Sequence, residues 1–136
     1  MTTVVVDASI VVRGCLEATG FEFIAGVDRV GPRLLPSEAL SALHELLWRG
    51  EISPVLAERA LERLRGAPYK VQEPEGLTDA AWQVAESLGW AKTYDAEYVA
   101  LAQLLGHPLV TIDSRLARGA GRVVQIVGPG DLSTLG

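Results

Sequence analysis

The chain has 136 residues, of which 49% are hydrophobic and 21% charged, as in a folded globular domain. Its net charge of −5 argues against broad nonspecific binding to nucleic acid, although a bound cation could still bring a nucleic acid to one site. The single cysteine, Cys15, excludes an internal disulfide and a thiolate metal cluster. No apolar run approaches the roughly 20 residues that span a membrane, and no secretory signal pattern is recognisable, so we expect a cytoplasmic protein.

The amino-terminal half predicts a buried strand followed by helices. Three β-branched residues at 4–6 are typical of a strand covered on both faces, and helices are expected at 9–16 and 21–30. Prolines on either side of residues 33–35 favour a short edge strand or an extended connection there. Two stronger helices follow at 37–49 and 54–65, since glycines end them and Ser53-Pro54 is a start signal for the second.

The carboxyl-terminal half repeats the alternation of strands and helices. Further helices are expected at 78–88, at 94–105 and in a short stretch from 114, and strands at 69–71, 109–112 and 122–127. The tail after Gly-Pro-Gly at 128–130 has no regular pattern. This order predicts an α/β protein, a three-layer α/β/α sandwich around a mostly parallel sheet, in one domain covering residues 1–136.

Four carboxylates stand at the ends of the expected elements. Asp7 directly follows the strand at 4–6, and Asp113 directly follows the strand at 109–112. Glu38 and Asp95 lie in the first turns of helices, where the positive end of the helix dipole favours a negative charge. Because ligands of open α/β sheets bind outside the carboxyl ends of the strands, we expect the four acids to share one pocket.

Such a pocket predicts a metal site. Four neighbouring carboxylates repel one another and raise the pKa of some members unless a cation binds. With oxygen donors and no paired His or Cys, the natural ligand is a hard divalent ion such as Mg²⁺ or Mn²⁺. Such ions activate water and stabilise the leaving oxygen in phosphodiester hydrolysis. Asp7, Glu38, Asp95 and Asp113 are therefore the expected catalytic and metal-binding residues.

Four segments carry a resemblance to a known family. They are VVVDAS at 4–9, SEALSAL at 37–43, TYDAEYVALA at 93–102 and TIDSRL at 111–116. In this order and with these spacings they resemble the signature segments of PIN-domain ribonucleases, in particular the VapC toxins of prokaryotic toxin–antitoxin pairs. The four acids named above fall at the acidic metal-site positions of that family.

The resemblance implies a Mg²⁺- or Mn²⁺-dependent ribonuclease that cleaves RNA, forms a homodimer and is inhibited by a cognate VapB-type antitoxin. Glu45 lies on nearly the same helix face as Glu38 and is the alternative for that position. Two other functions stay open. One is a PIN-like module that binds RNA or protein without cutting, and the other is a structure-specific DNA nuclease of the same fold.

Several other side chains allow two interpretations. Ser9 and Thr111 could hydrogen-bond to the carboxylates or could simply cap a helix and end a strand. Trp82 and Tyr98 could stack on bases, although aromatic residues at helical spacings more often pack in the core or against a partner. Trp48, beside Arg49 near a helix end, is the best candidate for an antitoxin or dimer contact.

Overall fold

In the computed structural model, which describes residues 1–135, one parallel sheet forms the centre of the molecule. Its five strands are β1 (Thr3–Val6), β2 (Asp28–Gly31), β3 (Lys70–Val71), β4 (Leu109–Val110) and β5 (Ile126–Val127). They lie in the order β3-β2-β1-β4-β5, and every neighbouring pair is parallel. The expected α/β/α sandwich with a parallel sheet is confirmed.

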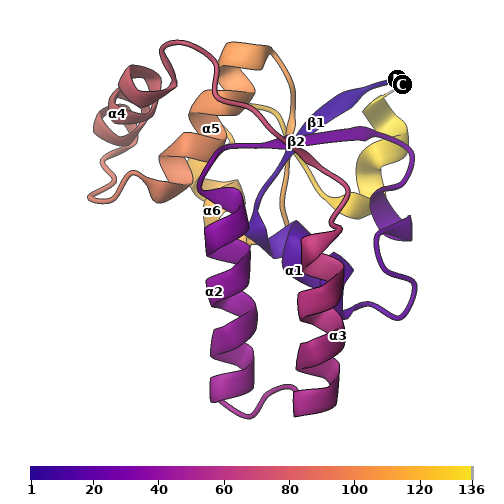
Figure 1. The fold of residues 1–136 in the computed structure, drawn as a ribbon. Coiled ribbons are helices and arrows are strands. Elements are labelled where there is room, and N and C mark those ends of the chain that lie inside the picture. The colour runs from indigo at the N-terminus through magenta and orange to yellow at the C-terminus, as the bar shows by residue number, and fades with distance from the viewer. Residues whose placement is uncertain (136) are drawn as a thin grey trace.

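The helices pack in two groups, α1 with α2 and α3, and α4 with α5 (Figure 1). Their bounds are α1 (Ala8–Leu16), α2 (Leu35–Trp48), α3 (Pro54–Arg65), α4 (Leu77–Leu88), α5 (Tyr94–Leu105) and α6 (Ser114–Ala120), with 3₁₀ helices η1 (Glu22–Ile24) and η2 (Pro129–Leu135). The pair α2–α3 projects below the sheet as a helical hairpin in Figure 1. None of the helices in the described part of the chain has the length and hydrophobicity required to cross a membrane.

The order of the strands creates a switch point between β1 and β4. The chain builds the sheet outward from β1 through β2 to β3, and then returns to add β4 on the other side of β1. Val5 pairs with Leu109 and Val6 with Val110, so both strands end at the same level. The connections leave this edge in opposite directions, which is the arrangement at which open α/β sheets bind their ligands. The residues that follow Val6 and Val110 therefore face a common opening.

The core explains why this opening is rigid. The three valines of β1 are at most 1% exposed, because helices cover both faces of the strand. Helix α5 contributes a nearly continuous buried set, as its apolar sequence predicts: Ala96, Tyr98, Val99, Ala100, Leu101 and Ala102. The first turn of α5 is thereby fixed beside the carboxyl ends of β1 and β4.

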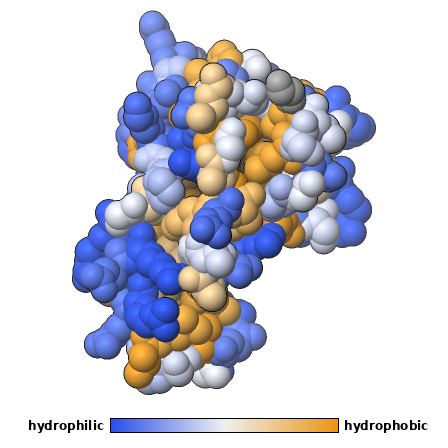
Figure 2. Space-filling view, turned by 90° about the vertical axis from the view of Figure 1, so that its right-hand side faces the viewer, coloured by the Kyte–Doolittle hydropathy of each residue, from blue (hydrophilic) through white to orange (hydrophobic). Residues whose placement is uncertain are grey.

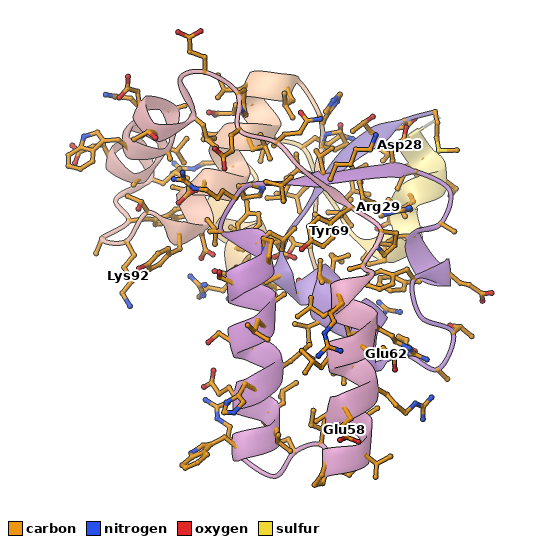
Figure 3. The ribbon with its side chains drawn as sticks, in the orientation of Figure 1. Asp28, Arg29, Glu58, Glu62, Tyr69 and Lys92 are labelled. Carbon is orange, nitrogen blue, oxygen red and sulfur yellow. The ribbon has the colours of Figure 1, made fainter. Side chains whose placement is uncertain are left out.

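The prediction for residues 21–35 was wrong in two places. The expected helix at 21–30 is the short η1 followed by strand β2, and residues 33–35, expected as an edge strand or an extended connection, form a turn that leads into α2 at Leu35. The contacts of Arg29 hold this segment in place. Its guanidinium donates to the carbonyl oxygens of the nearby Ile24 (2.6 Å) and Val27 (2.7 Å) and to that of Pro68 (2.6 Å), which is 39 residues away. Arg29 lies beside Tyr69 in Figure 3, on the side of the sheet that carries β3.

The carboxyl-terminal end also differs from the prediction. Only residues 126 and 127 of the expected strand at 122–127 pair with β4, and the tail that has no regular pattern in the sequence forms η2. The Thr134 hydroxyl donates to the carbonyl oxygen of Asp131 at 2.6 Å, which helps to close this helix locally. A 3₁₀ helix needs little periodicity, and a hydrophobic pattern therefore does not reveal it.

Replacing Gly14 with Ala is expected to destabilise the fold by about 1–3 kcal/mol. Gly14 lies in α1, and a Cβ there would overlap the ring of Phe21, which packs on the core. The ring would have to leave its place. Gly26→Ala is the matched control, since nothing lies within 4 Å of its added Cβ. Urea denaturation should separate the two variants, and equal midpoints would contradict this account of Gly14.

Candidate active site

Asp7 lies at the switch point, one residue beyond β1, and its carboxylate is held on both oxygens. The Ser9 hydroxyl donates to Oδ1 at 2.6 Å, and the Thr111 hydroxyl donates to Oδ2 at 2.6 Å. The amide of Ile10 also donates to Oδ1 at 3.3 Å, so Asp7 caps α1. The side chain is only 4% exposed. An aspartate of fixed orientation therefore lies at the switch point, directly after β1.

Asp113 and Asp95 lie at the same edge of the sheet, on the side of β4 and α5. Asp113 follows β4 and caps α6, because its Oδ1 accepts from the amides of Arg115 (2.9 Å) and Leu116 (3.2 Å). Asp95 lies in the first turn of α5. The guanidinium of Arg115 lies between the two carboxylates, with Nη2 at 2.8 Å from Asp95 Oδ2 and 3.6 Å from Asp113 Oδ2. A single cationic group thus bridges two of the four acids.

Glu38 comes from the first turn of α2 and is half-buried. Its Oε1 accepts a hydrogen bond of 2.7 Å from the hydroxyl of Tyr98, which is fully buried in α5. Glu45, the alternative considered from the sequence, lies two turns further along α2 and pairs with Arg49 at the surface. Of the two glutamates, Glu38 is the one that faces the other acids.

The electrostatics link the four carboxylates. Burial raises the pKa of Asp7, and the charge of Asp113 raises it further, while its hydrogen bonds act in the opposite direction. Burial also raises the pKa of Glu38, with further contributions from the charges of Asp95 and Asp7. The structure therefore brings the four predicted site residues near one another, and the charges of their neighbours oppose the ionisation of Asp7 and Glu38.

The donor set fits a hard divalent cation. Oxygen atoms provide all the candidate ligands, and a cationic group, Arg115, already lies between Asp95 and Asp113. Across residues 1–135, however, no three His, Cys, Asp or Glu side chains are arranged as a ready-made metal-binding group. A bound ion would therefore require Asp95 and Asp113 to exchange their contact with Arg115 for the metal.

Two contributors were not assigned to the site from the sequence. Tyr98 was interpreted as a core or stacking aromatic, yet its hydroxyl holds Glu38. Arg115 belongs to the segment at 111–116, but the sequence assigned it no role of its own. The spacing contains a signal for Tyr98, because it follows Asp95 by three residues and so lies on the same side of the helix. No comparable rule identifies Arg115, whose side chain reaches across from α6 to α5.

Tyr98→Phe is expected to lower the free energy of unfolding by about 1–2 kcal/mol. The substitution keeps the buried ring and removes the hydroxyl that donates to Glu38, which leaves a half-buried carboxylate with less stabilisation. Tyr94→Phe is the control, since that ring is exposed on the same helix. Chemical denaturation of both variants measures the difference. An equal loss in the two would contradict a role for the Tyr98 hydroxyl.

The sequence pattern that defines the PIN domain matches residues 4–122, from β1 to just beyond α6. The chain therefore belongs to the PIN-domain family, as the four sequence segments predicted. Because this match includes all four acids, the acid site at the switch point lies entirely within the family domain.

Within this family the chain is similar to VapC ribonucleases. It is 33% identical over 115 residues to VapC ribonuclease Mb0985 of Mycobacterium bovis, a match that covers 84% of this chain and 88% of that protein. It is 37% identical over 123 residues to ribonuclease VapC1 of Mycobacterium tuberculosis, covering 88% of this chain and 82% of the relative. The crystal structure of PAE2754 from Pyrobaculum aerophilum shares the fold, with a TM-score of 0.75, 24% identity and coverage of 98% and 94%.

Proposed function

We propose that this PIN-domain protein is a cytoplasmic, metal-dependent endoribonuclease, the toxin of a toxin–antitoxin pair. In this proposal Asp7, Glu38, Asp95 and Asp113 bind Mg²⁺ or Mn²⁺ and carry out hydrolysis of RNA phosphodiester bonds. The observation that carries the proposal is the meeting of these four carboxylates at the switch point of the sheet, around the buried Asp7. The relatives named as VapC ribonucleases support RNA as the substrate.

A divalent ion at this place would supply charge that activates a water and stabilises the leaving oxygen. The residues of the chain provide the geometry. Ser9 and Thr111 fix the carboxylate of Asp7, and the Tyr98 hydroxyl fixes that of Glu38. Arg115 neutralises Asp95 and Asp113, and once released it is free to face a phosphate of the substrate. Orientation of the acids before substrate arrives lowers the cost of assembling the site.

The test is a cleavage assay with purified protein, structured RNA, and single- and double-stranded DNA, in Mg²⁺, in Mn²⁺ and in EDTA. We expect RNA cleavage that stops in EDTA and returns when Mn²⁺ is added in excess. Cleavage of DNA in place of RNA would support the structure-specific DNA nuclease. Binding of RNA that remains whole under every metal condition would support the non-catalytic module and reject the ribonuclease.

We further propose that a VapB-type antitoxin binds the helical hairpin. An apolar groove of about 270 Å³ lies between α2 and α3, and it is lined by Leu40, Leu43, His44, Leu47, Pro54, Ala57, Glu58 and Leu61. Trp48, at the end of α2, is 84% exposed. In Figure 2 the lower lobe carries a hydrophobic area beside a hydrophilic one. Exposed apolar surface of this kind is typical of a protein–protein contact.

The partner proposal is tested by co-expression with the reading frame next to the gene of this chain. A stable complex that suppresses RNA cleavage is the expected result, and Leu47→Asp in the groove should weaken it without changing cleavage by the free protein. We also propose a homodimer, which light scattering would detect as twice the chain mass of 14.5 kDa. A monomer at all concentrations would reject that part.

A further inference from the structure

A second cavity opens beside the four acids. It has a volume of about 440 Å³ and lies between the segments after β2 and β3, the first turns of α4 and the beginning of α5. The side chains used below all line it: Arg33, Glu73, Asp79, Trp82, Thr93 and Glu97. Nothing in the proposed cleavage chemistry uses these side chains.

The cavity and the acid site occupy the same edge of the sheet. Arg33 follows β2 by two residues and Glu73 follows β3 by two residues, while Asp7 follows β1 by one. Glu97 shares the first turn of α5 with Asp95. The edge of the sheet thus carries the acid site over β1 and β4 and continues into the cavity over β2 and β3. A chain of nucleotides cleaved at Asp7 could extend along it.

The charges lining the cavity favour hydrogen-bond donors over phosphate. Arg33 Nε lies 3.6 Å from Glu73 Oε1, so these two charges largely offset each other. In the part of the chain that the structure describes, no hydrogen bond or ion pair engages the carboxylates of Glu97 and Asp79. Carboxylates repel a phosphate but accept hydrogen bonds from N–H groups. The nucleotide part that suits the cavity is therefore a base.

An aromatic surface completes the cavity. Trp82 projects from α4 and is 62% exposed, although α4 buries Ala81, Val84 and Ala85 on its inner face. An indole left open beside a polar cavity provides a stacking platform for a base. Lys92, in the loop before α5, points away from the ribbon in Figure 3 and places a positive charge outside the cavity, where a backbone phosphate could run.

We propose that this cavity binds a guanine base of the RNA substrate, next to the phosphate that the acid site cleaves. Guanine presents two adjacent donors, N1–H and the N2 amino group, which match the two oxygens of one carboxylate. Glu97 accepts these hydrogen bonds, and Trp82 stacks on the ring. The inference rests on the proposed ribonuclease function for its substrate, and it adds sequence preference to that function.

The test measures binding, so that it is independent of cleavage. Fluorescence anisotropy would compare the RNA pentanucleotides UUGUU, UUAUU, UUCUU and UUUUU on the full chain, with Ca²⁺ in place of Mg²⁺ or Mn²⁺. We expect UUGUU to bind about tenfold or more tightly than the others, the ratio that a bidentate base contact provides. Glu97→Gln should reduce that ratio to within about twofold, because its amide cannot accept both hydrogen bonds.

Two further variants separate stacking from base reading. Trp82→Ala should weaken all four RNAs by about tenfold without changing their order, and Glu86→Gln, on the same helix but outside the cavity, should change nothing. Equal affinities for the four RNAs, no measurable binding, or an unchanged guanine preference in Glu97→Gln would overturn the proposal. A protein that cleaves RNA without preferring guanine would retain the proposed function and lose only this inference.

Discussion

Asp7→Asn is expected to reduce RNA cleavage at least about a hundredfold while the fold is preserved. The substitution keeps the size of the side chain and removes the charge that holds the cation. The amide oxygen of the new residue can still accept a hydrogen bond from Ser9 or Thr111, so α1 and β4 keep a link through this position. Cleavage rates under saturating Mn²⁺, together with circular dichroism spectra, measure both halves of the prediction.

Asp28→Asn is the matched control for this experiment. Asp28 is an exposed aspartate at the beginning of β2 (Figure 3). Asp7 follows the end of the neighbouring parallel strand β1, so the two residues lie at opposite edges of the sheet. Loss of the Asp28 carboxylate should leave cleavage unchanged. If the Asp7 variant cleaved RNA as fast as this control, the assignment of the acids would be wrong, whatever the RNA chosen.

The strands that carry the acids could be predicted from the sequence because their signals are local. Three valines before Asp7 and an apolar run before Asp113 define buried parallel strands, and parallel strands in one sheet present their carboxyl ends to the same edge. Strand β2 has no such signal. Its four residues include Asp28 and Arg29, and the strand depends on hydrogen bonds from Arg29 to residues as distant as Pro68.

The arrangement of the site could be predicted only in part. The four acids could be predicted because they are carboxylates at the ends of strands and in the first turns of helices. The hydroxyl groups that orient them became visible only in the structure. Tyr98 donates to Glu38 across 60 positions, and Thr111 donates to Asp7 across 104. Contacts at such separations depend on how α2, α5, β1 and β4 pack together, which the periodicity of one segment does not contain.

Divalent cations are expected to raise the melting temperature more at about pH 7.5 than at about pH 5. The folded-state pKa of Asp7 is raised above its ordinary value of 3.8, and that of Glu38 above 4.5. For a carboxyl group with a raised pKa, the stabilising contribution is fully present below the unfolded value and is lost as pH rises through the folded value. Ionisation of Asp7 and Glu38 as pH rises therefore costs stability, and a bound cation offsets that cost.

At a hundredfold excess over its dissociation constant, the ion should contribute about 2.7 kcal/mol, which raises the melting temperature by roughly 7–12 °C for a domain of this size. Calorimetry with Mn²⁺ and with NaCl of equal ionic strength gives the comparison. Without metal at neutral pH, Asp7→Asn should melt at a higher temperature than the natural chain, because the substitution removes a buried charge. The rise in melting temperature on adding Mn²⁺ should be mostly lost in this variant. The same Mn²⁺ shift at both pH values, or in both proteins, would show that the cation binds elsewhere.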